Sequence, residues 1–241
     1  KLLASPTVMV LELNVPSLTS FDPGQWVDFM APPEDFVGGF SIASPPSDLP
    51  QVTLAIKRSR ARASTWVHDE ASVGRDLKIK VGGNCTLGGQ DNKTVVFCAG
   101  GIGVSPVLGN YREFLSRRQH LGNSSANPKS MFLYSVSTQT ELVFGEELAQ
   151  LFYNHQKNED RMIFTLTKSS CWQTPEKFGG WNSARQAIEL RIGRYLCEFL
   201  DAAPTDAVFY ICGPPAMNDD AVAYLEAKGI PSANMKYEKW W

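Results

Sequence analysis

The sequence feature that most limits the fold is a run of apolar residues that is followed by a glycine-rich segment. Residues Thr94–Ala99 read Thr-Val-Val-Phe-Cys-Ala, a continuous apolar run of the kind that forms a strand covered on both faces. The run continues into Gly100-Gly101-Ile102-Gly103-Val104-Ser105-Pro106, and helical spacing follows from Pro106 to about Gln119. A buried strand that turns into a helix through glycines is typical of a parallel sheet with helices on both faces.

The rest of the C-terminal half repeats this alternation of strand and helix. Further strands are predicted at Ser130–Val136, Arg161–Leu166 and Ala207–Cys212. Helices are predicted at Glu146–Asn154, at about Arg185–Leu200 and at Asn218–Lys228. We therefore expect residues 92–241 to form a Rossmann-like domain with a parallel sheet of five strands.

The first 91 residues have a different pattern. Short alternating runs separated by Pro, Gly and Asp turns indicate an antiparallel barrel or sandwich, with strands at Val8–Leu13, Gln25–Phe29, Val52–Lys57 and Leu77–Val81. A short helix is predicted at Ser64–Glu70, with Ser64 as a candidate N-cap. The turn-rich segment Gly88–Asn92 marks the expected domain boundary, and Gly122–Lys129 is expected to be a polar loop.

Composition excludes several classes of protein. The net charge of −2 gives no electrostatic footprint for nucleic acid, and no apolar run approaches the ~20 residues of a membrane span. Five cysteines without a Cys-x-x-Cys pair, and three scattered histidines, predict no metal site and favour a reducing intracellular compartment. Because the chain opens on Lys1 close to a strand-like run, we expect missing N-terminal residues, where a targeting sequence would lie.

Two glycine loops carry the chemistry. In the Ala99–Pro106 loop, glycines would let the backbone approach a pyrophosphate, and the following helix N-terminus would supply N–H donors. Alone, this loop is as consistent with a tight turn that binds nothing. The segment Cys212-Gly213-Pro214-Pro215-Ala216-Met217 follows the fourth strand of the half. Because ligands bind at the carboxyl ends of parallel strands, both loops are expected at one edge, which favours a nicotinamide dinucleotide site.

Taken in order, these segments resemble the ferredoxin–NADP reductase superfamily, which includes cytochrome b5 reductase-like flavoenzymes. The resemblance covers nearly the whole chain, and the group it matches best is that of the oxidoreductase NAD-binding domain-containing proteins. It is carried by the two glycine loops, the stretch Tyr134–Phe144, and by Pro23–Val27, Phe40–Ser44, Leu54–Lys57, Ala63–Val67 and Tyr237–Trp241. The resemblance implies that residues 1–91 form a Greek-key barrel that binds FAD, and that residues 92–241 bind NAD(P).

The resemblance also implies roles for single residues. Phe40 would pack on the flavin ring, Ser41 would face its reactive nitrogen, and Ser64 and Thr65 would hold its phosphates. Cys212 and Glu238 would lie beside the nicotinamide, so that Ser41, Cys212 and Glu238 are the candidate catalytic residues. The remaining candidate cofactor-binding residues are Ile42, Ile56, Lys57, Ala63, Gly100, Gly101, Ile102, Gly103, Val104, Pro106, Ser137, Lys168, Gly213, Pro214, Met217, Trp240 and Trp241. Each also has an ordinary structural explanation, such as a place in the core for Phe40 and Cys212.

The chain departs from the family at positions that bear on the flavin. The usual flavin-site arginine falls on Gly38, and the usual tyrosine is Phe40. Gly83 replaces a proline, and Ile102 replaces a threonine near the nicotinamide. The basic residues Lys57, Arg58, Arg60 and Arg62 are candidates to compensate, or they form a solvated edge. These departures motivate an alternative, a nucleotide-binding protein that has lost its flavin.

The nucleotide and the electron acceptor are less constrained. Ser137 replaces a frequent family arginine, whereas Lys168 resembles the basic residue of NADPH-using members, so NAD(H) and NADP(H) both stay open. The 241 residues contain no ferredoxin-type cysteine cluster, and we expect an unknown acceptor, such as a separate redox protein. The resemblance implies a mitochondrial location.

Overall fold

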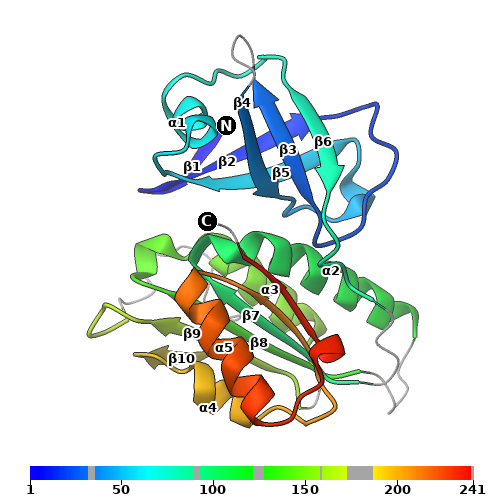
Figure 1. Ribbon diagram of the computed structural model, residues 1–241, viewed down its shortest axis with the longest axis vertical. Coiled ribbons are helices and arrows are strands. Elements are labelled where there is room, and N and C mark those ends of the chain that lie inside the picture. Colours follow the sequence, from blue (N-terminus) through cyan, green and yellow to red (C-terminus); the bar gives the residue numbers. More distant parts are fainter. Residues whose placement is uncertain (32–35, 89–92, 122–127, 158, 173–186, 240–241) are drawn as a thin grey trace.

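The computed structural model describes residues 1–31, 36–88, 93–121, 128–157, 159–172 and 187–239. It has two parts stacked along its longest axis, a β domain above and an α/β domain below (Figure 1). The predicted boundary near residue 91 lies outside the described residues. Within the described ranges, no helix combines the length and apolar character of a membrane span, and no cluster of three metal-ligating side chains occurs.

The β domain consists of two small antiparallel sheets. One has the order β1–β2–β5 and the other β4–β3–β6, from β1 (Leu2–Ser5), β2 (Val8–Asn14), β3 (Trp26–Ala31), β4 (Phe36–Ser41), β5 (Gln51–Lys57) and β6 (Lys78–Gly82). An isolated bridge between Ile42 and Leu54 joins the two sheets. In both sheets, alternate residues point inward. Together with Trp66 of α1 (Arg62–Asp69), they form one hydrophobic core.

The C-terminal domain is a parallel sheet of six strands in the order β10–β9–β8–β7–β11–β12. The strands are β7 (Val95–Gly100), β8 (Ser130–Val136), β9 (Arg161–Leu166), β10 (Glu189–Ile192), β11 (Val208–Cys212) and β12 (Met235–Glu238). From β7 the sheet grows through β8 and β9 in one direction and through β11 in the other. The switch point between β7 and β11 is where such sheets bind ligands.

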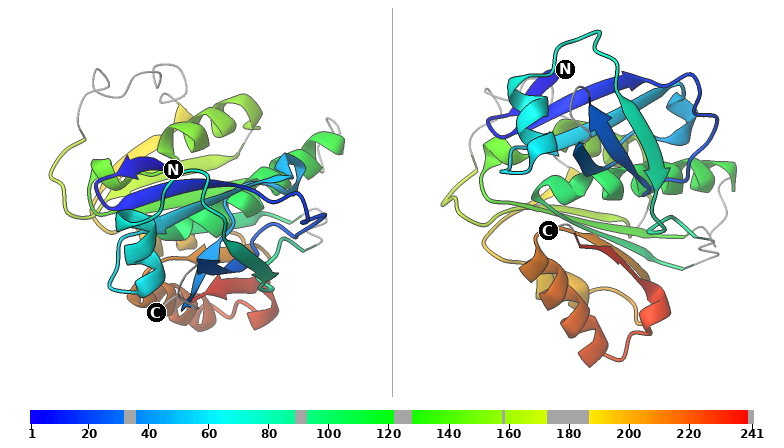
Figure 2. Two further views of the ribbon diagram at one scale, coloured as in Figure 1. Left: turned by 90° about the horizontal axis from the view of Figure 1, so that it is seen from above. Right: turned by 45° about the horizontal axis from the view of Figure 1, so that its top comes forward.

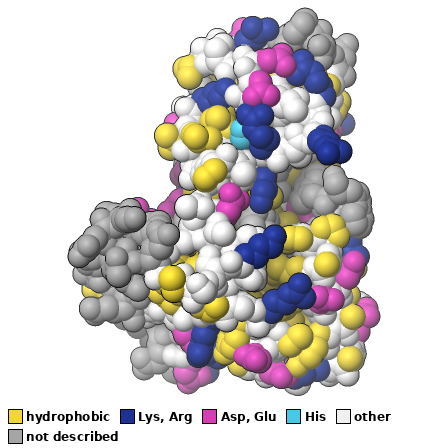
Figure 3. Space-filling model, turned by 90° about the vertical axis from the view of Figure 1, so that its left-hand side faces the viewer, with side chains coloured by type: hydrophobic (Ala, Val, Ile, Leu, Met, Phe, Trp, Pro, Cys, Tyr) yellow, Lys and Arg dark blue, Asp and Glu magenta, His cyan; other side chains and the backbone are white. Residues whose placement is uncertain are grey.

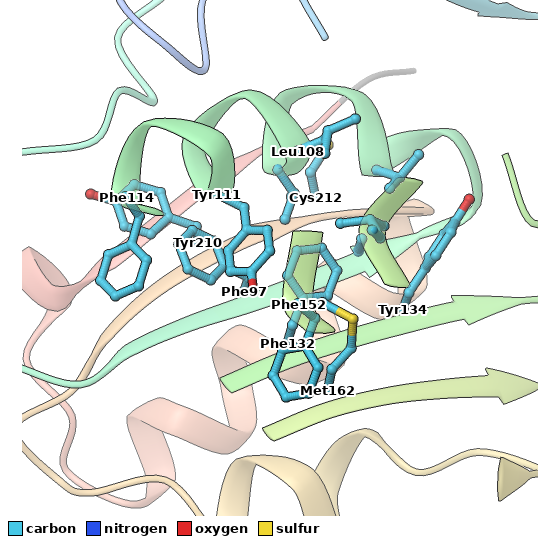
Figure 4. Close-up of a cluster of buried hydrophobic side chains, with 14 of the residues drawn as sticks. Phe97, Leu108, Tyr111, Phe114, Phe132, Tyr134, Phe152, Met162, Tyr210 and Cys212 are labelled. Carbon is cyan, nitrogen blue, oxygen red and sulfur yellow. The ribbon is translucent and has the colours of Figure 1, made fainter. Parts of the chain in front are cut away.

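Helices cover both faces of this sheet (Figure 2). They are α2 (Val104–His120), α3 (Gly145–His155), α4 (Leu196–Asp201) and α5 (Pro215–Ala227). Alternate strand residues supply the two cores: Phe97 packs with α2 and α3, and its neighbours Val96 and Cys98 pack with α4 and α5. The first core is rich in aromatic rings, which lie between α2 and the strands (Figure 4). This alternation accounts for the continuous apolar runs in the sequence.

Three sequence predictions need correction. The sheet has six strands, not five, because β10 and β12 extend it at its edges. The predicted helix over 185–200 is wrong over most of its described residues: Glu189–Ile192 pairs with β9 as a strand, and the α-helix begins only at Leu196 and ends at Asp201. Ser64 is not an N-cap, since α1 begins at Arg62 after the extended residue Ala61.

Candidate functional site

The two glycine loops touch at the switch point of the sheet, as predicted. A Cβ atom placed on Gly103 would lie 2.2 Å from the backbone oxygen of Cys212. A Cβ on Gly213 would lie 3.1 Å from the Cα of Gly100, and one on Gly100 would meet the sulfur of Met217 at 2.4 Å. These three glycines are therefore required for contact between the two loops. From the sequence, we expected these glycines to make room for a ligand.

Gly101 is the glycine that faces open space. Its φ is +54°, which favours glycine, and a Cβ there would meet no atom within 4 Å. Val104 and Pro106 follow in the first turn of α2, a helix of 17 residues whose N-terminal N–H groups attract anions. In the same turn, Ser105 is 2% exposed and its hydroxyl has no partner among the described residues. The loop thus has backbone donors at its surface and, behind them, one buried hydroxyl without a partner among the described residues.

Cys212 and Glu238 lie side by side at the carboxyl ends of β11 and β12, where they are register partners. Cys212 is buried, and burial, with a smaller effect of the nearby Glu238, raises the pKa of its thiol well above the ordinary value. The sulfur is therefore an uncharged thiol at neutral pH. Asn218 of α5 fixes this edge by donating a hydrogen bond of 2.7 Å to the backbone oxygen of Glu238. Trp240 and Trp241 lie outside the described residues.

Ser137 and Lys168 meet at the same edge, after β8 and β9. The N–H of Lys168 donates to the backbone oxygen of Ser137 at 2.9 Å. The Lys168 side chain is exposed, and no described residue forms an ion pair with it. A backbone hydrogen bond therefore joins the two residues that the resemblance linked to the choice between NADH and NADPH.

On the β domain, Phe40 and Ser41 end β4 close to the other half of the molecule. Phe40 is half-buried, with its ring edge-on to Phe29 at a centroid distance of 5.5 Å. Ser41 is 8% exposed, and no described residue forms a hydrogen bond with its hydroxyl, which keeps contact with solvent. A half-buried aromatic ring beside a free hydroxyl fits the ring end of a flavin.

The expected phosphate end has different chemistry. Ser64 is buried, donates to the backbone oxygen of Lys57 and accepts the N–H of Ser59, each at 2.9 Å. The Thr65 hydroxyl donates to the backbone oxygen of Arg62 at 2.9 Å. Both hydroxyls assigned to the flavin phosphates are thus engaged within the chain. The backbone N–H groups of the first turn of α1 remain as donors.

The nearby basic side chains are engaged as well. Lys57 pairs with Glu141 at 3.3 Å, Arg58 with Asp69 at 2.7 Å, and Arg62 with Glu70 at 2.5 Å. Figure 3 shows acidic and basic side chains interspersed over the β-domain half of one face. At the missing arginine, a Cβ on Gly38 would lie 2.4 Å from that of Ala63, because α1 packs directly on β4. Ile56, another candidate, is fully buried in the core.

The two domains are joined along α2, by contacts that the sequence did not predict. Arg112 donates to the backbone oxygen of Ala43 at 2.7 Å and also binds the carboxylate of Glu147 on α3. A Cβ on Gly109 would approach the backbone oxygen of Ile42 to 3.3 Å. The segment that follows Phe40 and Ser41 is therefore held against the helix that begins at the glycine loop.

A second contact lies at the start of α2. Ile102 packs with Val8 and Ala55 of the β domain and with Val143. Its apolar side chain packs in the contact between the domains, where the hydroxyl of a threonine would meet apolar neighbours. Beside it, the Thr7 hydroxyl donates to a Glu141 oxygen at 2.8 Å. These contacts involve ordinary residue types far apart in sequence, so local motifs could not reveal them.

The two domains and their sheets define a class by fold: two-domain proteins with the fold of ferredoxin–NADP reductases. The model of the oxidoreductase NAD-binding domain family matches residues 97–223. The chain is 32% identical to oxidoreductase NAD-binding domain-containing protein 1 of Danio rerio, over 98% of this chain and 88% of the relative. The chain therefore belongs to the oxidoreductase NAD-binding domain family.

Solved structures agree on the fold. A cytochrome P450 reductase from Amycolatopsis is 19% identical with a TM-score of 0.77, covering 98% of this chain and 66% of that one. The flavohem-like FAD/NAD-binding domain of nitric oxide dioxygenase from Vibrio cholerae is 19% identical with a TM-score of 0.75, over 98% and 94% of the two chains.

Proposed function

We propose that the protein is an NAD(P)H-dependent flavin oxidoreductase that passes electrons to a separate redox protein. The observation that carries this proposal is the link through α2. Helix α2 begins at the glycine loop. Two turns further along, Arg112 forms a hydrogen bond with the segment that follows Phe40 and Ser41. Hydride transfer between two bound rings requires that both be held in a fixed relation. A nucleotide site and a flavin site that both contact one helix would meet this requirement.

On the nucleotide side, backbone donors of the Gly101–Val104 segment would hold the pyrophosphate. Cys212 would present an uncharged thiol to the nicotinamide, and Glu238 would supply a polar contact. Lys168 would favour NADPH because its exposed ammonium lies where an additional ribose phosphate is expected. For the compartment, we propose a reducing one, consistent with five free cysteines, and specifically the mitochondrion.

On the flavin side, Phe40 and Ser41 would hold the ring, and the first turn of α1 would face the phosphates. When bound, the flavin would accept a hydride from the nicotinamide and release electrons to the next carrier. The second candidate function is a flavin-free nucleotide-binding protein, which Gly38 favours. The uncommitted Ser41 hydroxyl favours the reductase instead.

Oxidation of NADPH and NADH by the protein, with and without added FAD, tests the proposal. We expect FAD-dependent loss of the reduced-nicotinamide absorbance, and faster loss with NADPH. In Lys168→Ala the preference for NADPH should fall, while the rate with NADH stays close to that of the unaltered protein. Nucleotide binding without FAD-dependent oxidation would favour the flavin-free alternative.

A further inference from the structure

We propose that the protein recognises its flavin by the ring alone and takes it as an exchangeable substrate, accepting riboflavin, FMN and FAD with similar affinity. This inference rests on the proposed function and names the substrate class of the flavin site. Its basis is a contrast between the two ends of that site. At the ring end, no described residue forms a hydrogen bond with the Ser41 hydroxyl, whereas the Ser64 and Thr65 hydroxyls at the phosphate end bond within the chain.

The ring end is ready for a ligand. Ser41 is buried at the end of β4, with a hydroxyl that no described group engages. Phe40 beside it is half-buried, and its ring packs edge-on against Phe29. The following backbone is fixed to α2 through the bond from Arg112 to the Ala43 oxygen. Stacking on Phe40 and one hydrogen bond with Ser41 would contact only the isoalloxazine ring, which riboflavin, FMN and FAD share.

The phosphate end lacks a clamp. The hydroxyls of Ser64 and Thr65 each bond the backbone of their own segment. Three of the four nearby cations form ion pairs, and the family arginine is replaced by Gly38, with Ala63 packed against it. Arg60 is the basic side chain here for which the described residues provide no ion pair.

The missing contacts set the expected selectivity. A charge-assisted contact to a phosphate contributes on the order of tenfold or more in affinity, and a site with several such contacts prefers FAD strongly. The first turn of α1 still offers backbone donors, which contribute about twofold to fivefold for an anion at an exposed helix end. We therefore expect the dissociation constants of riboflavin, FMN and FAD to lie within about tenfold of each other.

The reaction balances without another reactant. The nicotinamide loses a hydride and becomes NAD(P)+, and the oxidised flavin gains that hydride and one proton from solvent. The two-electron-reduced flavin then leaves, because no charged side-chain clamp holds its phosphates. The acceptor that receives its electrons meets free reduced flavin in this scheme.

Equilibrium titration of the full chain with riboflavin, FMN and FAD, followed by flavin fluorescence, tests the inference. Three dissociation constants within about tenfold of each other would support it. Binding of FAD or FMN more than about tenfold tighter than riboflavin would overturn it and leave the proposed function intact. If none of the three binds, both the inference and the proposed function fail.

Two variants locate the recognition. Ser41→Ala should weaken all three flavins by a similar factor of about fivefold to tenfold, the value of one hydrogen bond. Arg60→Ala should leave the ratio of FAD to riboflavin affinity unchanged. A selective loss of FAD affinity in Arg60→Ala would show that this side chain holds a phosphate and would contradict the inference.

Discussion

At the residue scale, the glycines of the two loops have separate roles. Gly100, Gly103 and Gly213 allow one loop to pack on the other, and Gly101 adopts a positive φ beside open space. The sequence predicted that the two loops lie at one edge of the sheet. It could not show which glycines contact the other loop, because the contact partner lies more than 100 residues away. A motif reports which backbone conformations are allowed, and only the fold shows what approaches each position.

Gly103→Ala tests this division, with Gly101→Ala as its control. The new methyl group at position 103 would collide with the backbone of Cys212, so we expect the loops to separate, with about 2–4 kcal/mol lost in stability. Nucleotide affinity should fall with it. At position 101 the methyl meets no atom, and strain should cost only about 1–2 kcal/mol. Equal effects of the two substitutions in urea denaturation would contradict the assignment.

The buried thiols give a prediction about pH. Burial, with a smaller effect of Glu238, raises the pKa of Cys85 to about 12, whereas an unfolded thiol has a pKa of about 8.5. The folded state therefore keeps a proton that the unfolded state loses. The resulting stability is fully present below the unfolded pKa and declines as the pH rises toward the folded one.

Urea denaturation over a series of alkaline pH values measures this decline. The difference in unfolding free energy between the unaltered protein and Cys85→Ala should shrink by up to about 1.4 kcal/mol per pH unit above pH of about 8.5. A difference that stays constant across this range would show that the thiol is not held protonated by the fold.

At the element scale, strong periodicity predicted most strands and helices within a few residues. The error over 185–200 arose where two patterns join: Ile188, Leu190 and Ile192 alternate as in a strand, and Leu196, Phe199 and Leu200 have helical spacing. A four-residue edge strand is too short to be separated from the helix that follows it. The ion pairs that anchor these elements were also beyond prediction, since their partners are distant in sequence.

The buried pair of Arg118 and Asp160 anchors the end of α2 to the strands beneath it. The side chains are 2% and 1% exposed, and Asp160 also accepts the N–H of Ser130 at 2.7 Å. Arg118→Met would leave this carboxylate buried without its charge partner. We expect a loss of about 3–5 kcal/mol in urea denaturation, against less than about 1 kcal/mol for the exposed control Arg58→Met. Similar losses for both variants would be inconsistent with this role.

At the scale of the whole molecule, function depends on how the domains are held together. Sequence reasoning predicted the two domains and their candidate sites, yet it placed none of the contacts along α2. The side chain of Arg112 bridges Ala43 of one domain and Glu147 of the other. Such a contact depends on tertiary geometry, because Arg112 and Glu147 lie in no recognised motif and Ala43 contributes only its backbone oxygen.

Arg112→Ala should uncouple the two sites without destroying either. We expect nucleotide and flavin affinities within about threefold of the original, and flavin reduction slowed by about tenfold to a hundredfold, since small misplacement is costly in transfer reactions. Lys228→Ala, which removes a surface pair with Asp201, serves as a control that should change neither. Loss of flavin reduction in proportion to lost nucleotide affinity would argue against a coupling role for Arg112.

The central claim is that a nicotinamide bound at the glycine loops reduces a flavin bound at Phe40 and Ser41. Anaerobic stopped-flow mixing of the protein, saturated with flavin, with NADPH or NADH measures that step directly. The account predicts rapid bleaching of the visible flavin absorbance, with one nicotinamide oxidised for each flavin reduced. A flavin that stays oxidised while the nucleotide is bound would contradict it.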